Sequence, residues 1–228
     1  MDIMFYVRKN MQIYPFLRSK LFHKPIVHVI GDSHVSPFLG EKLFLVHHVG
    51  PATAFGLIKT NSATKSNKKL FKVINNMEKN RDVALLVFGE IDCRLHIFNQ
   101  YRKSVEIFTL EEIMRKTIYN YSLIMEQINA LGISFYVYGV PPASTQRNIY
   151  NYEYYADQKT RIEINKKYNN MLKKFCIENG YRYIDVYEIS ADDNGLIKTI
   201  YAKDEVHLNN NIVPYVKSIL KNDHIGPY

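Results

Sequence analysis

The sequence lacks the segments that would place a chain in or across a membrane. No apolar stretch approaches the roughly 20 residues that a membrane-spanning helix needs. The first residues also lack the apolar core of about 7–15 residues that a secretory signal requires. We therefore expect the protein to remain in the cytoplasm.

Cysteine is scarce, and internal repeats and low-complexity linkers are absent. The two cysteines, Cys93 and Cys176, cannot form a disulfide framework, which agrees with a reducing compartment. With 228 residues, 46% of them hydrophobic, the chain suits one domain with a full core. We expect this domain over residues 25–228. Residues 1–24, rich in aromatic and basic side chains, are expected to pack on it, with an oligomer contact or a membrane-surface element left open.

No recognisable nucleic-acid-binding module accompanies the net charge of +8, which comes from 30 basic and 22 acidic residues. Such a charge is compatible with nucleic acid, an anionic membrane surface or an acidic glycan. The basic residues are spread along the chain, apart from a cluster on a predicted helix (Lys65, Lys68, Lys69 and Lys72) that we interpret as a solvated face. We therefore expect no nucleic-acid partner.

Strand-like and helix-like patterns alternate from residue 25 onward. Short apolar runs predict strands at residues 25–31, 43–50, 83–89, 133–140 and 181–188. Helical spacing of apolar residues predicts helices at 65–80, 111–131 and 157–179, and a closing helix at 209–221. This alternation predicts an α/β fold, a three-layer α/β/α sandwich with a mainly parallel sheet.

Polar residues follow two of these strands and recur near the C-terminus. They form the groups Gly31-Asp32-Ser33-His34, Gly89-Glu90-Ile91-Asp92-Cys93-Arg94 and Asp204-Glu205-Val206-His207. In open parallel sheets, ligands bind outside the carboxyl ends of the strands. We therefore expect the functional residues to gather at that edge.

The last group can supply a base for a serine nucleophile. Asp204 and His207 are three positions apart, so a turn places them on the same side. The carboxylate can then fix one imidazole nitrogen and leave the other free to take a proton from Ser33. The sequence thus holds the parts of a triad in the order Ser33, Asp204, His207.

These motifs resemble those of the SGNH or GDSL-type hydrolases. Gly31-Asp32-Ser33 matches the first motif of that family, and Asp204 to His207 matches its last. The resemblance spans residues 26 to about 210 and implies a flavodoxin-like three-layer fold with serine-based ester chemistry. It also implies that the backbone N–H groups of Ser33 and Gly50 hold the oxyanion.

One motif departs from the family pattern. Where the family has G-x-N-D, with an asparagine that donates to the oxyanion, this chain has Gly89-Glu90-Ile91-Asp92. Ile91 cannot donate, and the loss of one such donor can slow a reaction roughly 100- to 1000-fold. Arg94, in the same loop, is a candidate to compensate. The G-E-I-D-x-R variant resembles SGNH-like proteins encoded in bacterial surface-polysaccharide gene clusters.

Several polar residues near these motifs are candidates for substrate binding: Asp32, His34, Glu90, Asp92 and Arg147. Asp32 and His34 have an alternative role as turn and packing residues, and Glu90, Asp92 and Arg94 as an ion-pair cluster. Asp92, Cys93 and His96 lack the second ligand pair that a zinc site needs, so we expect no metal.

Three hypotheses follow from the sequence. The first is a serine esterase that acts on an acyl ester, most simply an acetyl ester, of a carbohydrate or small molecule; an O-acetyltransferase of a surface-polysaccharide sugar would use the same triad. The second is a catalytically weak binding module on the same fold, and the third, which rests only on the net charge of +8, is an anionic-surface or nucleic-acid binder. No cofactor is expected, although a transferase could take acetyl-CoA as its donor, and a homo-oligomer stays open.

Overall fold

The computed structural model describes residues 21, 24–105, 107–146 and 152–223. The predicted N-terminal extension, residues 1–24, lies almost entirely outside the described residues, and so do Arg147 and the last five residues. None of the described helices is both long and apolar enough to cross a membrane. The cytoplasmic location stays a prediction.

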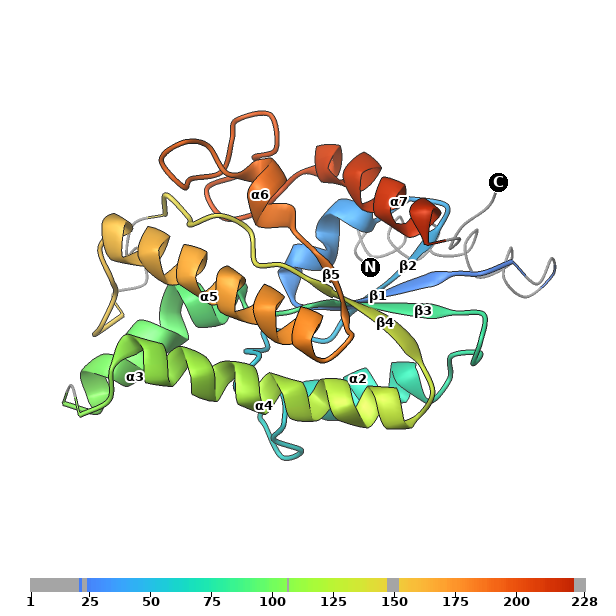
Figure 1. Ribbon diagram of the computed structural model, residues 1–228, viewed down its shortest axis with the longest axis horizontal. Helices are drawn as coiled ribbons and strands as arrows, with labels where there is room; N and C mark the ends of the chain where they lie inside the picture. Colours follow the sequence, from blue (N-terminus) through green and yellow to red (C-terminus); the bar gives the residue numbers. More distant parts are fainter. Residues whose placement is uncertain (1–20, 22–23, 106, 147–151, 224–228) are drawn as a thin grey trace, which may run out of the picture.

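The described residues form a five-stranded parallel sheet with the order β2-β1-β3-β4-β5 (Figure 1). Its strands are β1 (Val27–Gly31), β2 (Phe44–His48), β3 (Val83–Val87), β4 (Ser134–Tyr138) and β5 (Arg182–Ile184). β1 and β3 are buried along their whole length, as their continuous apolar runs predict for strands covered on both faces. The predicted α/β fold with a parallel sheet is confirmed.

Helices cover both faces of the sheet (Figure 1). Ile30, Leu86 and Val137 point to a core shared with α2 (Ser66–Ile74), α3 (Ile97–Lys103), α4 (Leu110–Ala130) and α5 (Gln158–Glu178). Val29, Leu85 and Tyr138 point to the opposite core, which includes the 3₁₀ helix η1 (Ser33–Phe38), α6 (Val186–Ser190) and α7 (Val213–Asn222). The three layers follow from this alternation of side chains along each strand.

Local signals explain where the long helix α4 begins and ends. The Thr109 hydroxyl accepts from the Glu112 N–H, and the Glu112 carboxylate accepts from the Thr109 N–H, which forms a capping box. Gly132, with φ +72°, follows the last turn in the left-handed conformation that glycine adopts without strain. The structure confirms the predicted helix to within one residue at each end.

The structure differs from the sequence prediction in four segments. The helix predicted at 65–80 ends at Ile74, with Asn75 as its C-cap. The last strand ends at Ile184 because the Asp185 side chain accepts from the Glu188 N–H and begins α6. Residues 92–103, for which no element was predicted, form the π-helical turn η2 (Asp92–His96) and α3. The predicted closing helix is divided into η3 (Asn210–Ile212) and α7.

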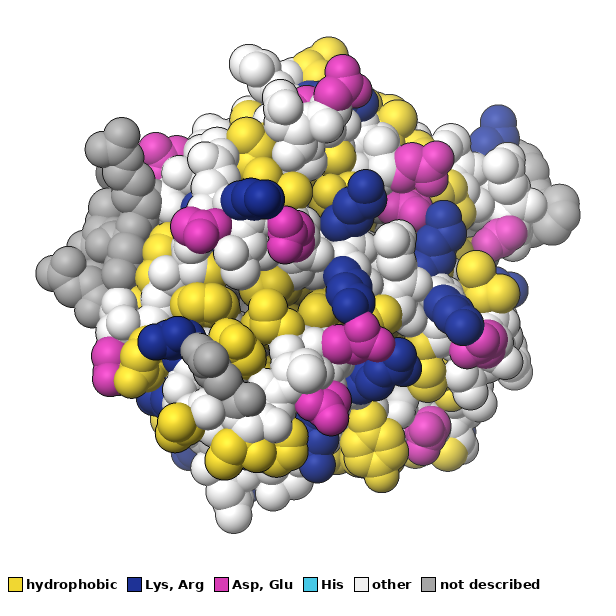
Figure 2. Space-filling model, turned by 60° about the vertical axis from the view of Figure 1, so that its left-hand side comes forward, with side chains coloured by type: hydrophobic (Ala, Val, Ile, Leu, Met, Phe, Trp, Pro, Cys, Tyr) yellow, Lys and Arg dark blue, Asp and Glu magenta, His cyan; other side chains and the backbone are white. Residues whose placement is uncertain are grey.

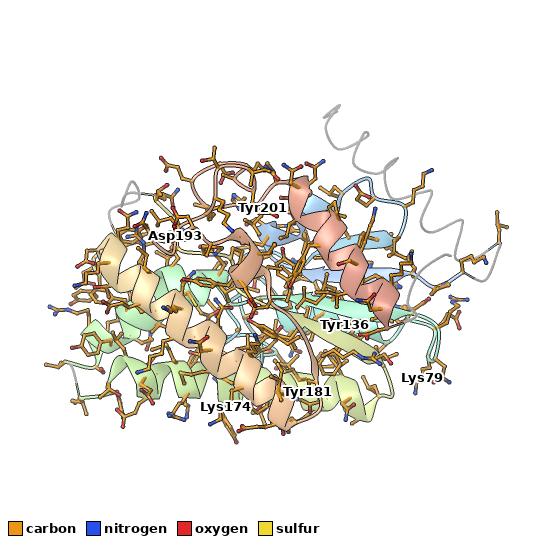
Figure 3. All side chains as sticks on the ribbon, turned by 45° about the horizontal axis from the view of Figure 1, so that its top comes forward. Lys79, Tyr136, Lys174, Tyr181, Asp193 and Tyr201 are labelled. Atoms are coloured by element: carbon orange, nitrogen blue, oxygen red, sulfur yellow. The ribbon has the colours of Figure 1, made fainter. Side chains whose placement is uncertain are left out.

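The two ends of the sheet differ in what they carry. Lys79, which precedes β3, lies at one end of the molecule, whereas Asp193, in the loop after α6, lies toward the other (Figure 3). The face shown in Figure 2 carries basic and acidic side chains interspersed, with apolar side chains between them. Among the described side chains on this face, charges of the two signs alternate without an extended patch of either one.

Gly31 allows β1 to lie against β3 where the chain leaves the strand toward Ser33. A Cβ at this position would lie 2.2 Å from the Val87 carbonyl oxygen and 2.8 Å from the Val87 Cβ. We predict that Gly31→Ala lowers the free energy of unfolding by about 3 kcal/mol or more, since backbone must move. Urea unfolding measures this change.

The matched control is Gly180→Ala, whose Cβ meets nothing within 4 Å but whose φ is +69°. This substitution should lower the free energy of unfolding by only about 1 kcal/mol, which is the cost of holding alanine in a left-handed backbone conformation. Equal losses in the two variants would show that the close approach at Gly31 does not matter.

Candidate active site

Ser33 lies at the carboxyl end of β1, where the strand turns directly into η1. The Asp32 side chain begins that helix by accepting the His34 N–H at 2.9 Å. Ser33 is the first residue of η1, and it is exposed between two buried neighbours. The local sequence therefore holds its hydroxyl at the edge of the sheet where the functional residues were expected.

Asp204 and His207 meet Ser33 from the other end of the chain. Asp204 Oδ1 accepts the N–H groups of Val206 and His207, each at 2.8 Å, which fixes the turn. The Nδ1 atom of His207 lies 2.9 Å from both carboxylate oxygens, and its Nε2 atom lies 2.8 Å from Ser33 Oγ. The hydrogen bond that the sequence predicts between Ser33 and His207 is therefore present.

The acceptors around His207 determine which of its nitrogens carries the proton. Nδ1 faces only carboxylate oxygens, so it donates, and Nε2 is left to accept from the Ser33 hydroxyl. Burial lowers the pKa of His207, and the bond to Asp204 offsets only part of this effect. Burial opposes ionisation of Asp204, but the hydrogen bonds from Val206 and His207 outweigh it and lower its pKa. A neutral imidazole beside a carboxylate is the state that a general base requires.

Gly50 follows β2 at the position that corresponds to Ser33 after β1. The strands are parallel with Gly31 opposite His48, so Ser33 and Gly50 each lie two residues beyond a paired position. Gly50 has φ +97°, which a side chain would strain. No backbone hydrogen bond among the described residues uses the N–H of Ser33 or Gly50. Both donors are thus available at this edge.

Arg94 is already engaged with protein groups. Its Nε and Nη2 atoms donate to the two Glu90 oxygens at 2.6 and 3.2 Å, and Nη1 donates to Gln146 Oε1 at 3.2 Å. The charge of Arg94 is therefore matched by Glu90. The structure links the loops after β3 and β4 through this contact, and Gln146 is the partner that the sequence did not single out. The one feature of the sequence that could have indicated Gln146 is its position next to Arg147, in the segment after the fourth predicted strand.

The four described candidates for substrate binding are buried. The exposed fraction is 1% for Asp32, 4% for His34, 5% for Glu90 and 0% for Asp92. Asp32 pairs with His34 at 3.0 Å, and Glu90 pairs with Arg94. The fifth candidate, Arg147, lies outside the described residues. In this arrangement the four side chains face protein groups beneath the Ser33–His207 contact.

Asp92 holds the loop that follows Gly50. Its carboxylate accepts the Ala54 N–H at 2.6 Å and the Phe55 N–H at 3.1 Å. Burial raises the pKa of Asp92 to about 7, and the two N–H groups oppose this rise. The Asp of the third motif thus ties the loop after β3 to the loop after β2.

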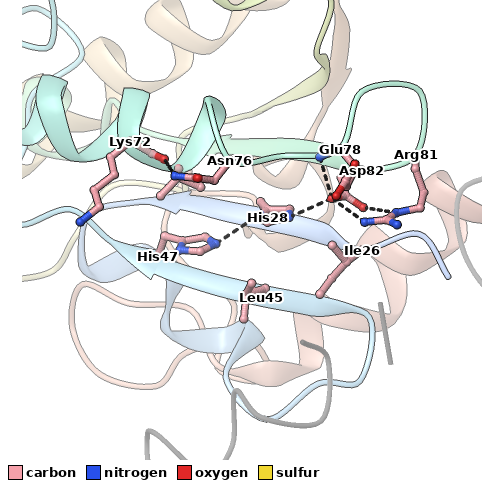
Figure 4. A pocket seen from close by; sticks show the side chains of 10 residues that line it. Ile26, His28, Leu45, His47, Lys72, Asn76, Glu78, Arg81 and Asp82 are labelled. Carbon is pink, nitrogen blue, oxygen red and sulfur yellow. Dashed lines mark hydrogen bonds and ion pairs between the residues drawn. The ribbon is translucent and has the colours of Figure 1, made fainter. Parts of the chain in front are cut away.

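Several other polar groups lie apart from this contact chain. His47 Nε2 lies 3.0 Å from His28 Nδ1, and both line a separate cavity of about 290 Å³ between β1, β2 and α2, together with Asp82 and Arg81 (Figure 4). Cys93 is buried. Within the described part of the chain, no cluster of three or more His, Cys, Asp or Glu side chains is arranged to hold a metal ion.

Comparisons with known proteins address the fold. No protein-family model matches the chain, and no curated protein does. Among solved structures, a GDSL-like lipase from Bacteroides thetaiotaomicron superposes with a TM-score of 0.56 at 13% identity, over 94% of this chain and 96% of that one. A carbohydrate acetylesterase from Sinorhizobium meliloti gives 0.53 at 11% identity, over 88% and 98%. An acetyl xylan esterase gives 0.53 at 14% identity, over 85% and 98%.

The chain has the SGNH/GDSL-hydrolase fold. The parallel sheet, the order of its strands and the coverage of nearly the whole chain all agree with the fold expected from the motifs. At this low identity, the SGNH fold alone does not specify what the chain does. The chemistry has to be argued from the site.

The raised pKa of Asp92 makes a prediction about stability. An acid whose pKa rises on folding, here from about 4 to about 7, stabilises the folded state below pH 4 and loses that contribution as the pH rises to 7. We predict that Asp92→Asn removes this loss, so that its free energy of unfolding falls less steeply between pH 5 and 7, by up to about 1.4 kcal/mol per pH unit.

Urea unfolding at several pH values measures this slope. The control is Asp193→Asn, which changes an exposed loop carboxylate and should leave the slope as in the wild type. An Asp92→Asn variant with the wild-type slope would show that the Asp92 carboxylate is ionised throughout this range.

Proposed function

We propose that the protein is a serine esterase that cleaves an acyl ester, with an acetyl ester of a carbohydrate or small molecule as the substrate class. The observation that carries the proposal is the contact chain Ser33 Oγ–His207 Nε2, 2.8 Å, and His207 Nδ1–Asp204, 2.9 Å. It lies at the carboxyl end of a parallel sheet, where ligands bind in such folds. Structural neighbours described as a carbohydrate acetylesterase and an acetyl xylan esterase support the substrate class.

The proposed reaction begins with transfer of the Ser33 hydroxyl proton to His207 Nε2 as Oγ bonds to the acyl carbon. Asp204 stays ionised and holds the Nδ1–H of the imidazolium. The carbonyl oxygen becomes an oxyanion that accepts the N–H groups of Ser33 and Gly50. The Nε2 proton then passes to the departing alkoxide oxygen as the C–O bond breaks, and an acyl-serine remains.

Water completes the cycle in the same geometry. It loses a proton to His207 Nε2 as its oxygen attacks the acyl carbon, and the proton returns to Ser33 Oγ as the acid leaves. A sugar hydroxyl in place of water would give acetyl transfer, with acetyl-CoA as a candidate donor. Asp32, Glu90, Asp92 and Arg94 support the loops in this proposal, since each is paired inside the protein.

A catalytically weak binding module is the second candidate, and Ile91 is the observation that favours it. Ile91 occupies the position where the family has a donor asparagine, and Arg94 is engaged by Glu90 and Gln146. The proposed oxyanion hole then contains two backbone donors. Such a site still permits catalysis, at a rate lowered by the missing donor.

A fluorophosphonate probe tests whether Ser33 is an activated nucleophile. We predict labelling of the wild type at Ser33, no labelling of Ser33→Ala, and a loss of labelling or of hydrolysis of p-nitrophenyl acetate by about 10³-fold or more in His207→Ala. The reason is that a serine hydroxyl reacts only when a base removes its proton.

The matched control is Ser36→Ala, in the same 3₁₀ helix, where the hydroxyl oxygen is buried without a partner. It should be labelled like the wild type. Absence of labelling in folded wild type would reject the esterase and leave the binding module. Labelling that survives in His207→Ala would show that His207 is not the base.

Replacement of Ile91 tests the oxyanion hole. We predict that Ile91→Asn raises kcat about 10-fold or more by supplying the missing donor, whereas Ile91→Leu, of similar volume and without a donor, does not. Steady-state kinetics with p-nitrophenyl acetate measure both. An unchanged kcat in a folded Ile91→Asn variant would indicate that another group already provides the third hydrogen bond.

A further inference from the structure

His34, the residue after the proposed nucleophile, is buried among hydrogen-bond acceptors. Its Nδ1 atom lies 3.0 Å from Asp32 Oδ1. Its Nε2 atom lies 3.3 Å from the Val206 carbonyl oxygen and 4.0 Å from Glu90 Oε2. A neutral imidazole has one nitrogen that can only accept, and here it would face an acceptor. Protons on both nitrogens satisfy both contacts, so this arrangement favours an imidazolium at His34.

The charges around His34 favour the same state. Asp32 and Glu90 are both buried, and Arg94 compensates only one of them. Burial alone would lower the pKa of His34, but the negative charges of Asp32 and Glu90 outweigh it and raise the pKa to about 9. A protonated His34 leaves the buried group of Asp32, His34, Glu90 and Arg94 with no net charge.

The ring of His34 also contacts the proposed base. The centroids of the His34 and His207 rings are 4.7 Å apart, with an angle of 33° between the planes. The Val206 carbonyl that accepts from His34 belongs to the residue just before His207, in the turn fixed by Asp204. His34 thus touches the base and holds its loop.

We infer that His34 is a positioning residue of the proposed triad: a permanent imidazolium that anchors the 204–207 turn and, by its charge, keeps His207 unprotonated. The positive charge of His34 disfavours protonation of the His207 ring, whereas the negative charges of Asp204 and Glu90 favour it. If the charge of His34 is removed, the two carboxylates raise the pKa of His207. The catalytic part of the inference rests on the proposed function.

The pH dependence of activity separates this role from simple packing. His207 must be neutral to act, so the acid limb of kcat/KM reports its pKa. In His34→Gln, which keeps a donor but has no charge, we predict that this limb moves up by about one pH unit. His47→Gln, which replaces a histidine in the separate cavity of Figure 4, should leave it in place. A uniform loss of kcat/KM at every pH, with an unmoved acid limb, would reduce His34 to a packing residue.

Nitrogen NMR of the histidine rings in the wild type tests the charge without activity. We predict that His34 keeps both ring protons from pH 5.5 to 8, while His207 titrates with a pKa below that of an ordinary histidine. A His34 ring that loses a proton near its ordinary value would overturn the inference. Because this readout needs neither turnover nor a variant, it stands if His34→Gln does not fold. If the spectra agree but the wild type does not react with the probe, the proposed function fails and the charge of His34 stands.

Discussion

Three buried acidic side chains at the ends of β1 and β3 determine how this edge of the sheet is built. Buried carboxylates are costly unless paired, and each has a different partner: His34 for Asp32, Arg94 for Glu90, and two backbone N–H groups for Asp92. The Asp92 pairing ties the loop after β3 to the loop after β2, while His34 also contacts the Val206 carbonyl and Arg94 also contacts Gln146. Ser33, His207 and Asp204 lie above these acidic side chains, so the geometry of the proposed triad depends on these buried charges.

The sequence predicted what depends on periodicity and on strand ends. The continuous apolar runs of β1 and β3 fit strands buried on both faces, and the apolar spacing of α4 fits a helix with one buried face. The polar groups after β1 and β3 meet because parallel strands end at one edge of the sheet. The contact between Ser33 and His207 was predicted from the spacing of Asp204 and His207 and from the resemblance of both motifs to those of the SGNH hydrolases. Burial of Glu90 and Asp92, and the engagement of Arg94 by Gln146, could not be predicted, since they depend on loops brought together only in the folded chain. α6 was missed because Asp185 caps a helix inside an apolar run.

Fold and chemistry are supported by different observations in this protein. The SGNH fold follows from the sheet and from neighbours that match almost the whole chain at 11–14% identity. The proposed ester chemistry follows from two hydrogen bonds and two open N–H groups. Hydrolysis and transfer share the acyl-serine and differ only in which hydroxyl reaches it, so the groups that admit water or a sugar hydroxyl decide between them, rather than the triad.

The central claim is that Ser33 attacks a carbonyl whose oxygen is held by the N–H groups of Ser33 and Gly50. A crystal structure of the wild type after reaction with a fluorophosphonate tests it most directly, because the phosphoryl oxygen of the adduct occupies the place of the oxyanion. The account predicts this oxygen about 2.7–3.1 Å from both N–H nitrogens, with His207 beside Ser33 Oγ. An adduct on Ser33 whose phosphoryl oxygen contacts Arg94 or solvent instead would contradict it.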